Sequence, residues 1–241
     1  MLKEIQFLQR QPDAKLYPFN IPALAGLKQI PIRKPVTFFI GENGSGKSTL
    51  LEAVASLCGF CSEGGSKHYL RESRDAGSML SANMRLSWQP KITNGFFLRA
   101  ESFYNLATYV DEMAASDRLI LKAYGGVSLH EQSHGEAFFS LFTHRFGRRG
   151  IYLLDEPEVA LSPSRQLAFL RLIWQLARQG GAQFLIATHA PILLAYPGAD
   201  IYSLDYAPLK LIDYEKTEHY RLTLAFLSNR EQFLRHLLED E

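Results

Sequence analysis

Short apolar runs alternate with longer amphipathic stretches along most of the chain. Val36–Ile40, Ile151–Leu154 and Phe184–Ala187 are rich in β-branched, aromatic and other apolar residues, which is typical of buried parallel strands. Between them, Ser48–Cys58 and Ser162–Gln179 repeat their apolar residues at helical spacing. This alternation predicts an α/β fold in which helices flank a mainly parallel sheet with right-handed crossovers.

The stretch 162–179 carries the clearest helix signals. Ser162 is a good N-cap, Pro163 suits the first helical position, and Gly180 and Gly181 form a stop. The buried stripe of this helix is expected to consist of Leu167, Leu170, Ile173, Trp174 and Ala177.

The regions around this alternation have a different character. Met1–Arg10 alternates apolar and polar residues and predicts a strand, whereas Cys61–Ser87 is polar, contains glycines and predicts a surface loop. Ser102–Ala115 has helical periodicity and follows an expected strand, Gly95–Arg99.

The C-terminal part alternates weakly through Ile201–Leu204 and Leu209–Ile212 and then becomes helical from about Thr217 to Leu238. We therefore expect one domain spanning 1–241, with a short helical arm at about 101–135 and C-terminal helices at about 214–241.

Composition narrows the class of protein. The chain has 241 residues, of which 46% are hydrophobic, and a formal net charge of +1. Its net charge is not that of a general nucleic-acid binder, which is strongly basic. The net charge leaves open whether a local basic patch exists. No apolar run approaches the roughly 18 to 20 residues that span a bilayer, and no targeting segment is evident, so we expect a cytoplasmic protein.

The two cysteines, Cys58 and Cys61, have C-x-x-C spacing. They could form a redox pair or, with His68, part of a zinc site. They could equally be two small apolar residues at the end of a helix. The sequence has no second C-x-x-C to complete a zinc site, which favours the second interpretation.

Three of the expected strands are followed by polar residues that could carry chemistry: Gly41–Thr49, Asp155–Glu156 and Thr188–His189. Because the carboxyl ends of parallel strands meet at one edge of a sheet, these segments predict a single shared site.

The first segment matches the pattern G-x-x-x-x-G-K-[ST]. Glycines allow a tight turn whose N–H groups point at phosphate oxygens, and the helix that follows adds its positive end. The pattern predicts ATP binding with Mg²⁺, in which Lys47 reaches the β- and γ-phosphates and the Ser48 hydroxyl binds the metal. The residues expected to hold nucleotide are Gly41, Glu42, Asn43, Gly44, Ser45, Gly46, Lys47, Ser48 and Thr49.

The other strand ends complete the expected chemistry. Asp155 would join the magnesium shell and Glu156 would polarise an attacking water, since hydrolysis depends on positioning and charge neutralisation. His189 could hydrogen-bond a γ-phosphate or the water. A solvated acidic turn and a structural histidine are the simpler interpretations, and the neighbouring phosphate-loop pattern argues against them.

Ser133 and Glu136 precede an apolar helix and have the spacing of a capping box. A capped helix start is also a ready anion site, so the same residues could grip phosphate. These two interpretations are compatible.

The order GENGSGKST, SHGE, LLDEP and THAP resembles the ABC ATPase superfamily over most of the chain, and in particular its stand-alone RecF/SMC-like branch. The resemblance implies a P-loop NTPase fold with a small antiparallel N-terminal β part. Gly41–Thr49 would be the Walker A loop, Asp155 the Walker B aspartate, Glu156 the catalytic base and His189 the switch histidine.

The resemblance also assigns the remaining motifs. Ser133, Gly135 and Glu136 would belong to the signature motif, Ala160–Pro163 to the D-loop, and Glu101 to the metal-binding position of the Q-loop; Tyr17 is a candidate to stack on adenine. Three positions depart from the family pattern. His134 replaces a signature glycine, Ser162-Pro163 stands where the D-loop has an aspartate, and Glu101 stands in place of glutamine.

In this superfamily, the signature motif of one subunit closes over ATP bound to the other. The resemblance therefore implies an ATPase that forms an ATP-sandwich homodimer and drives a process involving DNA or a protein partner. Two other functions stay open: the nucleotide-binding subunit of an ABC transporter, and an ATP-dependent binding module with little turnover. No heptad run indicates a coiled coil between the Q-loop and signature positions.

Overall fold

The computed structural model describes residues 1–8, 15–61, 76–147 and 149–238. Within these residues the strands form two sheets. The larger has six strands in the order β5-β6-β7-β3-β8-β9, and the smaller has three in the order β2-β1-β4. The large-sheet strands are β3 (Val36–Ile40), β5 (Gly95–Arg99), β6 (Gly150–Asp155), β7 (Ala182–Ala187), β8 (Asp200–Ser203) and β9 (Lys210–Leu211).

All neighbours in the large sheet are parallel except β9, which pairs antiparallel with β8. The small sheet is antiparallel and comprises β1 (Leu2–Phe7), β2 (Gln29–Pro31) and β4 (Met84–Trp88). The expected α/β fold, with its mainly parallel sheet and small antiparallel N-terminal part, is confirmed.

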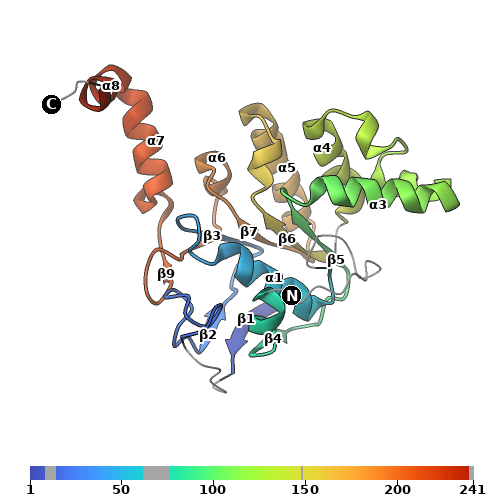
Figure 1. The fold of residues 1–241 in the computed structure, drawn as a ribbon, viewed down its shortest axis with the longest axis horizontal. Helices are drawn as coiled ribbons and strands as arrows, with labels where there is room; N and C mark the ends of the chain where they lie inside the picture. The colour runs from blue at the N-terminus through green and yellow to red at the C-terminus, as the bar shows by residue number, and fades with distance from the viewer. Residues whose placement is uncertain (9–14, 62–75, 148, 239–241) are drawn as a thin grey trace.

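Helices cover both faces of the large sheet (Figure 1). The α-helices are α1 (Lys47–Cys58), α2 (Ala76–Ser81), α3 (Phe103–Ser116), α4 (His134–Arg145), α5 (Pro163–Arg178), α6 (Pro191–Leu194), α7 (Glu218–Ser228) and α8 (Arg230–Leu238). Short 3₁₀ helices are η1 (Arg118–Tyr124), η2 (Leu129–Glu131), η3 (Pro157–Ala160) and η4 (Tyr214–Lys216). None of the helices in the described ranges is both long and apolar enough to cross a membrane.

Two hydrophobic cores lie on the two faces of the large sheet. Successive side chains of a strand point to opposite faces, so Phe38 joins the core beneath α3, α4 and α5, while Phe39 joins the core with α1 and the small sheet. Every residue of β3, β6 and β7 is buried. This two-sided burial explains why these strands appear in the sequence as continuous apolar runs.

The sequence-based expectation for Cys61–Ser87 was wrong over its second half. Residues 76–81 form α2, and 84–88 form β4, which pairs with β1. Met84, Leu86 and Trp88 alternate along β4 and pack in the core, while the intervening Arg85 and Ser87 made the stretch look polar. Residues 62–75, with His68, lie outside the described part of the chain.

The expected stripe of α5 is also corrected. Ile173 is buried and Leu170 and Ala177 pack against the core, as expected. Leu167 is 60% exposed and Trp174 is 42% exposed, and Phe169 and Leu176 are buried instead. The guanidinium carbon of Arg178 instead lies over the ring of Trp174, 4.6 Å from the ring centroid. The sheet contacts a face of the helix that is rotated from the one expected.

The C-terminal helices project from the body of the molecule, on the opposite side from α3 (Figure 1). Asn229, with φ −138° and ψ 44°, separates α7 from α8 within the region where C-terminal helices were expected. No residue is buried in either of these two described helices, Glu218–Ser228 and Arg230–Leu238.

Candidate active site

The loop between β3 and α1 begins at Gly41. Gly44 and Gly46 adopt left-handed backbone conformations, with φ 82° and 100°. A Cβ atom on Gly46 would lie 2.8 Å from a methyl group of Ile21, so the close approach of the loop to the small-sheet side also requires glycine there. The loop delivers Lys47 to the first position of α1.

The Lys47 side chain is folded into this loop. Its Nζ donates hydrogen bonds to the carbonyl oxygens of Gly41 at 2.7 Å and Glu42 at 3.1 Å, and only 4% of the residue is exposed. Burial lowers the pKa of Lys47, and the carboxylates of Glu156 and Asp155 oppose that shift. The ammonium group of Lys47 is therefore held between the loop carbonyls and the carboxylates at the end of β6.

Asp155 lies at the carboxyl end of β6, beside the start of α1. Its Oδ1 accepts a hydrogen bond from the Ser48 hydroxyl at 3.2 Å, and the Arg99 Nε lies 3.8 Å from its Oδ2. Burial raises the pKa of Asp155, although the Ser48 bond and Arg99 act against the rise. Carboxylate and hydroxyl oxygens are the kind of donor that Mg²⁺ prefers, and here one of each lies side by side.

Arg99 is a site residue that the sequence reasoning missed. Its register partner across the parallel sheet is Asp155, and its guanidinium group also pairs with Glu52 at 2.7 Å and with Glu101. Glu101 is 71% exposed, and the contacts that the structure gives it are with Arg99. A charged residue at the end of an apolar strand was the available signal for Arg99.

Glu156 and His189 face each other across the ends of β6 and β7. Glu156 has a left-handed backbone conformation, φ 52°, and its N–H donates to the carbonyl of Ala187 at 2.9 Å. The His189 Nε2 lies 3.6 Å from the Glu156 Oε1. The backbone N–H of His189 donates to the Glu158 carboxylate at 2.6 Å, which fixes the histidine segment against the turn after β6.

His219, in the first turn of α7, is a second residue that sequence reasoning did not find. Its Nε2 lies 2.9 Å from the Nδ1 of His189, within hydrogen-bond distance. Burial is the main cause that lowers the pKa of both histidines, and the ammonium group of Lys47 lowers both further. No local pattern around His219 could have pointed to this contact across 30 residues.

A cavity of about 400 Å³ opens over the glycine loop. It is lined by Tyr17, Asn43, Gly44, Gly46, Lys47, Ser48, Thr49 and Glu156. Tyr17 is about half exposed, and its hydroxyl lies 2.6 Å from the Thr49 Oγ1. The structure thus brings residues from two of the three predicted strand-end segments, together with Tyr17, to one cavity.

Ser133–Glu136 lies elsewhere in the molecule. The Glu136 carboxylate accepts hydrogen bonds from the backbone N–H and the hydroxyl of Ser133, which forms a capping box at the start of α4. Gly135 packs against the carbonyl of Ala160, where a Cβ atom would approach to 3.0 Å. Within the part of the chain that the structure describes, these residues do not line the loop cavity. The side chain of His134 lies outside the described part.

Both cysteines lie at or just beyond the C-terminal end of α1. Cys61 is buried and Cys58 is partly buried at the end of α1. Among the described residues, no group of three or more His, Cys, Asp or Glu side chains is arranged to hold a metal ion.

Comparison with known proteins defines the class. A nucleotide-free ATP-binding cassette from an ABC transporter superposes with a TM-score of 0.52 at 16% identity, covering 97% of this chain and 99% of the cassette. The SMC head domain from Thermotoga maritima gives a TM-score of 0.45 at 15% identity, over 88% of this chain and 98% of that domain. The cassette establishes the fold.

A relative found by sequence belongs to the same class of ATP-binding proteins. The thiamine import ATP-binding protein ThiQ of Cereibacter sphaeroides is 31% identical over 165 residues, which are 63% of this chain and 69% of the relative. The protein is therefore an ABC-type ATPase nucleotide-binding domain, as the motif order predicted. The chain belongs to the family described as AAA domain, putative AbiEii toxin, Type IV TA system, whose model matches residues 36–136 and 115–195.

Proposed function

We propose that the protein binds ATP with Mg²⁺ and hydrolyses it, and that two copies enclose the nucleotide between them. The observation that supports this function best is the meeting of Lys47, Ser48, Asp155 and Glu156 at the glycine loop cavity. Binding, metal-coordinating and proton-accepting groups then stand at one edge of the sheet.

Each residue has a role that its position suits. Lys47 would exchange its bonds to the Gly41 and Glu42 carbonyls for bonds to the β- and γ-phosphates, aided by the loop N–H groups. Ser48 and Asp155 would hold Mg²⁺, which neutralises phosphate charge when bound.

Glu156 would act as the base that accepts a proton from the water attacking the γ-phosphorus, while the bond to the β-phosphate oxygen breaks to release ADP and phosphate. His189 would donate a hydrogen bond to the γ-phosphate. Its Nε2 is buried without a hydrogen-bond partner among the described residues, and it faces Glu156. Glu101, held by Arg99, would contribute to the metal site only after that ion pair opens.

A second copy would complete the site. The signature residues Ser133, Gly135 and Glu136 do not line the loop cavity of their own described chain. In a two-fold dimer, the α4 N-terminus of one copy would close over the nucleotide held by the other. The domain 1–241 would act as one such unit, in the cytoplasm, on a DNA or protein partner.

The test compares the wild-type protein with Glu156→Gln by light scattering and phosphate release. The variant keeps the shape of the side chain but cannot accept the proton. With ATP and Mg²⁺ it should accumulate as a dimer without turnover, while the wild type hydrolyses ATP and returns to monomer. A variant that binds ATP and stays monomeric would overturn the sandwich. A Lys47→Ala variant that retains ATP affinity would overturn the assignment of the nucleotide site.

A second function is supported by the relative, which is itself named as an import ATP-binding protein. This chain would then be the nucleotide-binding subunit of a transporter whose membrane part is another chain. Purification of the tagged protein from detergent-solubilised membranes would decide between the two. Stoichiometric recovery of an integral membrane protein would favour transport, and recovery from the soluble fraction alone would favour the stand-alone ATPase.

A further inference from the structure

His219 lies outside every motif that defines the ATPase, yet it contacts the proposed switch histidine directly. The two rings are tilted by 50° with centroids 5.1 Å apart, and the Nε2 of His219 lies 2.9 Å from the Nδ1 of His189. Both rings are partly buried. Such a contact requires one nitrogen to donate and the other to accept.

The surroundings of His189 decide which nitrogen donates. Its Nε2 lies 3.6 Å from the carboxylate oxygen of Glu156, so a proton on Nε2 is favoured and a lone pair there is repelled. With the proton on Nε2, the neutral ring offers Nδ1 as an acceptor. His219 must then donate its Nε2–H to that atom, and its own Nδ1 is left unprotonated.

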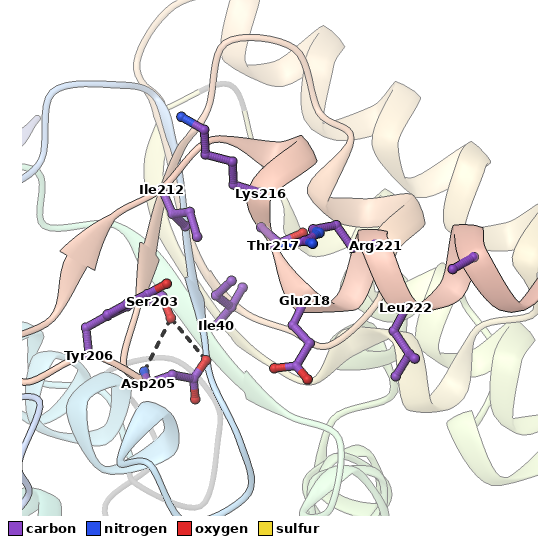
Figure 2. Close-up of a pocket in the computed structure, with 11 residues that line it drawn as sticks. Ile40, Ser203, Asp205, Tyr206, Ile212, Lys216, Thr217, Glu218, Arg221 and Leu222 are labelled. Atoms are coloured by element: carbon purple, nitrogen blue, oxygen red, sulfur yellow. Dashed lines mark hydrogen bonds between the residues drawn. The ribbon is translucent and has the colours of Figure 1, made fainter. Parts of the chain in front are cut away.

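The position of α7 leaves His219 available for this contact. Residues Glu218, Arg221, Leu222 and Ala225, which share one helical face, line a cavity of about 540 Å³ against the ends of β3 and β8 (Figure 2). Ser203 and Asp205 form the opposite wall. His219 stands on a different face of the helix and is therefore free to contact His189.

A second contact joins α7 to the same segment. Tyr220 of α7 packs on the ring of Tyr214 at 4.6 Å, and the hydroxyl of Tyr214 donates to the carbonyl of Pro191, two residues beyond His189. The base of the C-terminal arm, α7–α8, is thus attached both to His189 itself and to Pro191, two positions further along the chain.

We infer that His219 is a positioning residue for ATP hydrolysis. It fixes the ring orientation and tautomer of His189, so that His189 presents an Nε2–H to the γ-phosphate, and it joins the C-terminal arm to the nucleotide site. The inference rests on the proposed function, because it assigns His189 to the reacting phosphate. It does not require His219 to touch the nucleotide.

The kinetic test uses His219→Ala and His219→Gln in the full chain. Without the donor, His189 loses its orientation, so His219→Ala should lower kcat about 10- to 100-fold while the Kd for ATP stays unchanged. A glutamine amide can donate to Nδ1, so His219→Gln should recover much of the rate. His236→Ala, an exposed histidine on α8, is the matched control and should behave as wild type.

A readout independent of turnover separates this inference from the proposed function. In protein labelled with ¹⁵N-histidine at pH 8, the Nδ1 of His189 should resonate as an unprotonated acceptor, and its shift should change in His219→Ala. A protonated Nδ1 in the wild type would overturn the inference. So would a wild-type kcat in His219→Ala, or equal losses of rate and melting temperature in both His219 variants. A wild-type protein that shows the expected tautomer but no ATP turnover would instead overturn the proposed function.

Discussion

The hydroxyl of Ser48, in the first turn of α1, donates a hydrogen bond to the carboxylate of Asp155 at the end of β6, over 3.2 Å. These residues are 107 positions apart in the chain. The bond places a hydroxyl and a carboxylate side by side where Asp155 is only 6% exposed. A buried anion kept in such a place costs stability and is typical of a functional group.

Asp155→Asn should therefore stabilise the protein in metal-free buffer at pH 7. Burial raises the pKa of Asp155 above the unfolded value near 3.8, so the folded state favours the protonated carboxyl, and ionisation lowers stability once the pH exceeds that value. Arg99 keeps Glu52 as a partner in the variant. Urea denaturation should show a gain at pH 7 that shrinks as the pH falls towards 4.

ATP with Mg²⁺ should make the wild type more stable than Asp155→Asn. Mg²⁺ with ATP at about 100 times its Kd should stabilise the wild type by about 2.7 kcal/mol and Asp155→Asn by much less. Asp213→Asn, at a surface carboxylate that is 69% exposed, is the control and should change little. A less stable Asp155→Asn at pH 7 would mean that the Arg99 ion pair outweighs the cost of burial.

Tyr17→Ala should weaken ATP binding by about 5- to 150-fold, the range expected for losing one ring that stacks on a base. Tyr17 lines the loop cavity and its ring is available to a base. Tyr17→Phe keeps the ring, loses the bond to Thr49, and should retain most of the affinity. Isothermal titration would measure both, with Tyr104→Ala on α3 as the control; equal affinity in Tyr17→Ala and wild type would exclude stacking.

Ser133→Ala should reduce ATPase activity by about 100-fold without changing the Kd of the monomer for ATP, because Ser133 would act on nucleotide held by the other copy. Loss of the cap should also cost about 1 kcal/mol of stability. Ser128→Ala is the control, because the Ser128 hydroxyl caps η2 by accepting a hydrogen bond from the His130 N–H. Ser128→Ala should show a similar loss of stability but keep full activity. If Ser128→Ala lost as much activity as Ser133→Ala, the loss in Ser133→Ala would be explained by reduced stability alone.

The pair His189 and His219 should make stability depend on pH. Burial lowers the pKa of both rings, so the unfolded chain binds more protons from the folded pKa values up to about 6.5. The free energy of unfolding should be constant above about pH 6.5 as far as these two rings are concerned. Below that pH it should decrease by at most about 1.4 kcal/mol per pH unit for each proton. The charged groups facing the pair are Lys47, Glu42, Glu156, Asp205 and Glu218.

Denaturation at pH 7.5 and 5.5 would measure this slope. A double variant with glutamine at both positions removes the two titrations and should lose less stability between these pH values. The other histidines are common to both proteins and cancel in the comparison. Equal slopes would show that the two rings bind protons as readily in the folded as in the unfolded chain.

Gly95→Ala should destabilise the protein by at least about 2 kcal/mol, as overpacking against backbone does. A Cβ atom at this position would lie 2.0 Å from the carbonyl oxygen of Ile151 on β6, which cannot move without disturbing the sheet. Gly147→Ala is the control, since its nearest atom would be 3.7 Å away. Thermal unfolding would compare them, and equal melting temperatures would contradict the β5–β6 packing described here.

Local signals were sufficient for several elements. Val36–Ile40 and Gly95–Arg99 have the predicted bounds, because buried parallel strands are apolar throughout and end at polar residues. The glycine loop and α1 were also predictable, for a different reason. A strand, glycines with left-handed backbone and a helix start follow one another within a few residues, so their geometry depends little on the rest of the chain.

Short strands and helix faces were harder to predict. The polar residues of β4 hid a strand whose partner, β1, lies far away in sequence. The face of α5 that is buried depends on which surface the sheet presents, and the apolar Leu167 and Trp174 stayed outside. Sequence periodicity reports that a face exists, but the neighbours decide where its edges fall.

The sequence by itself determined the class of protein, the parallel sheet and the segments that carry the candidate chemistry, since each depends on contiguous residues. Only the tertiary structure decided the environment of that chemistry. It placed Arg99 beside Asp155, brought His219 to His189, and kept Ser133–Glu136 away from the glycine loop of its own chain. These relationships join residues that are distant in sequence, and chain topology and packing set them rather than any local pattern.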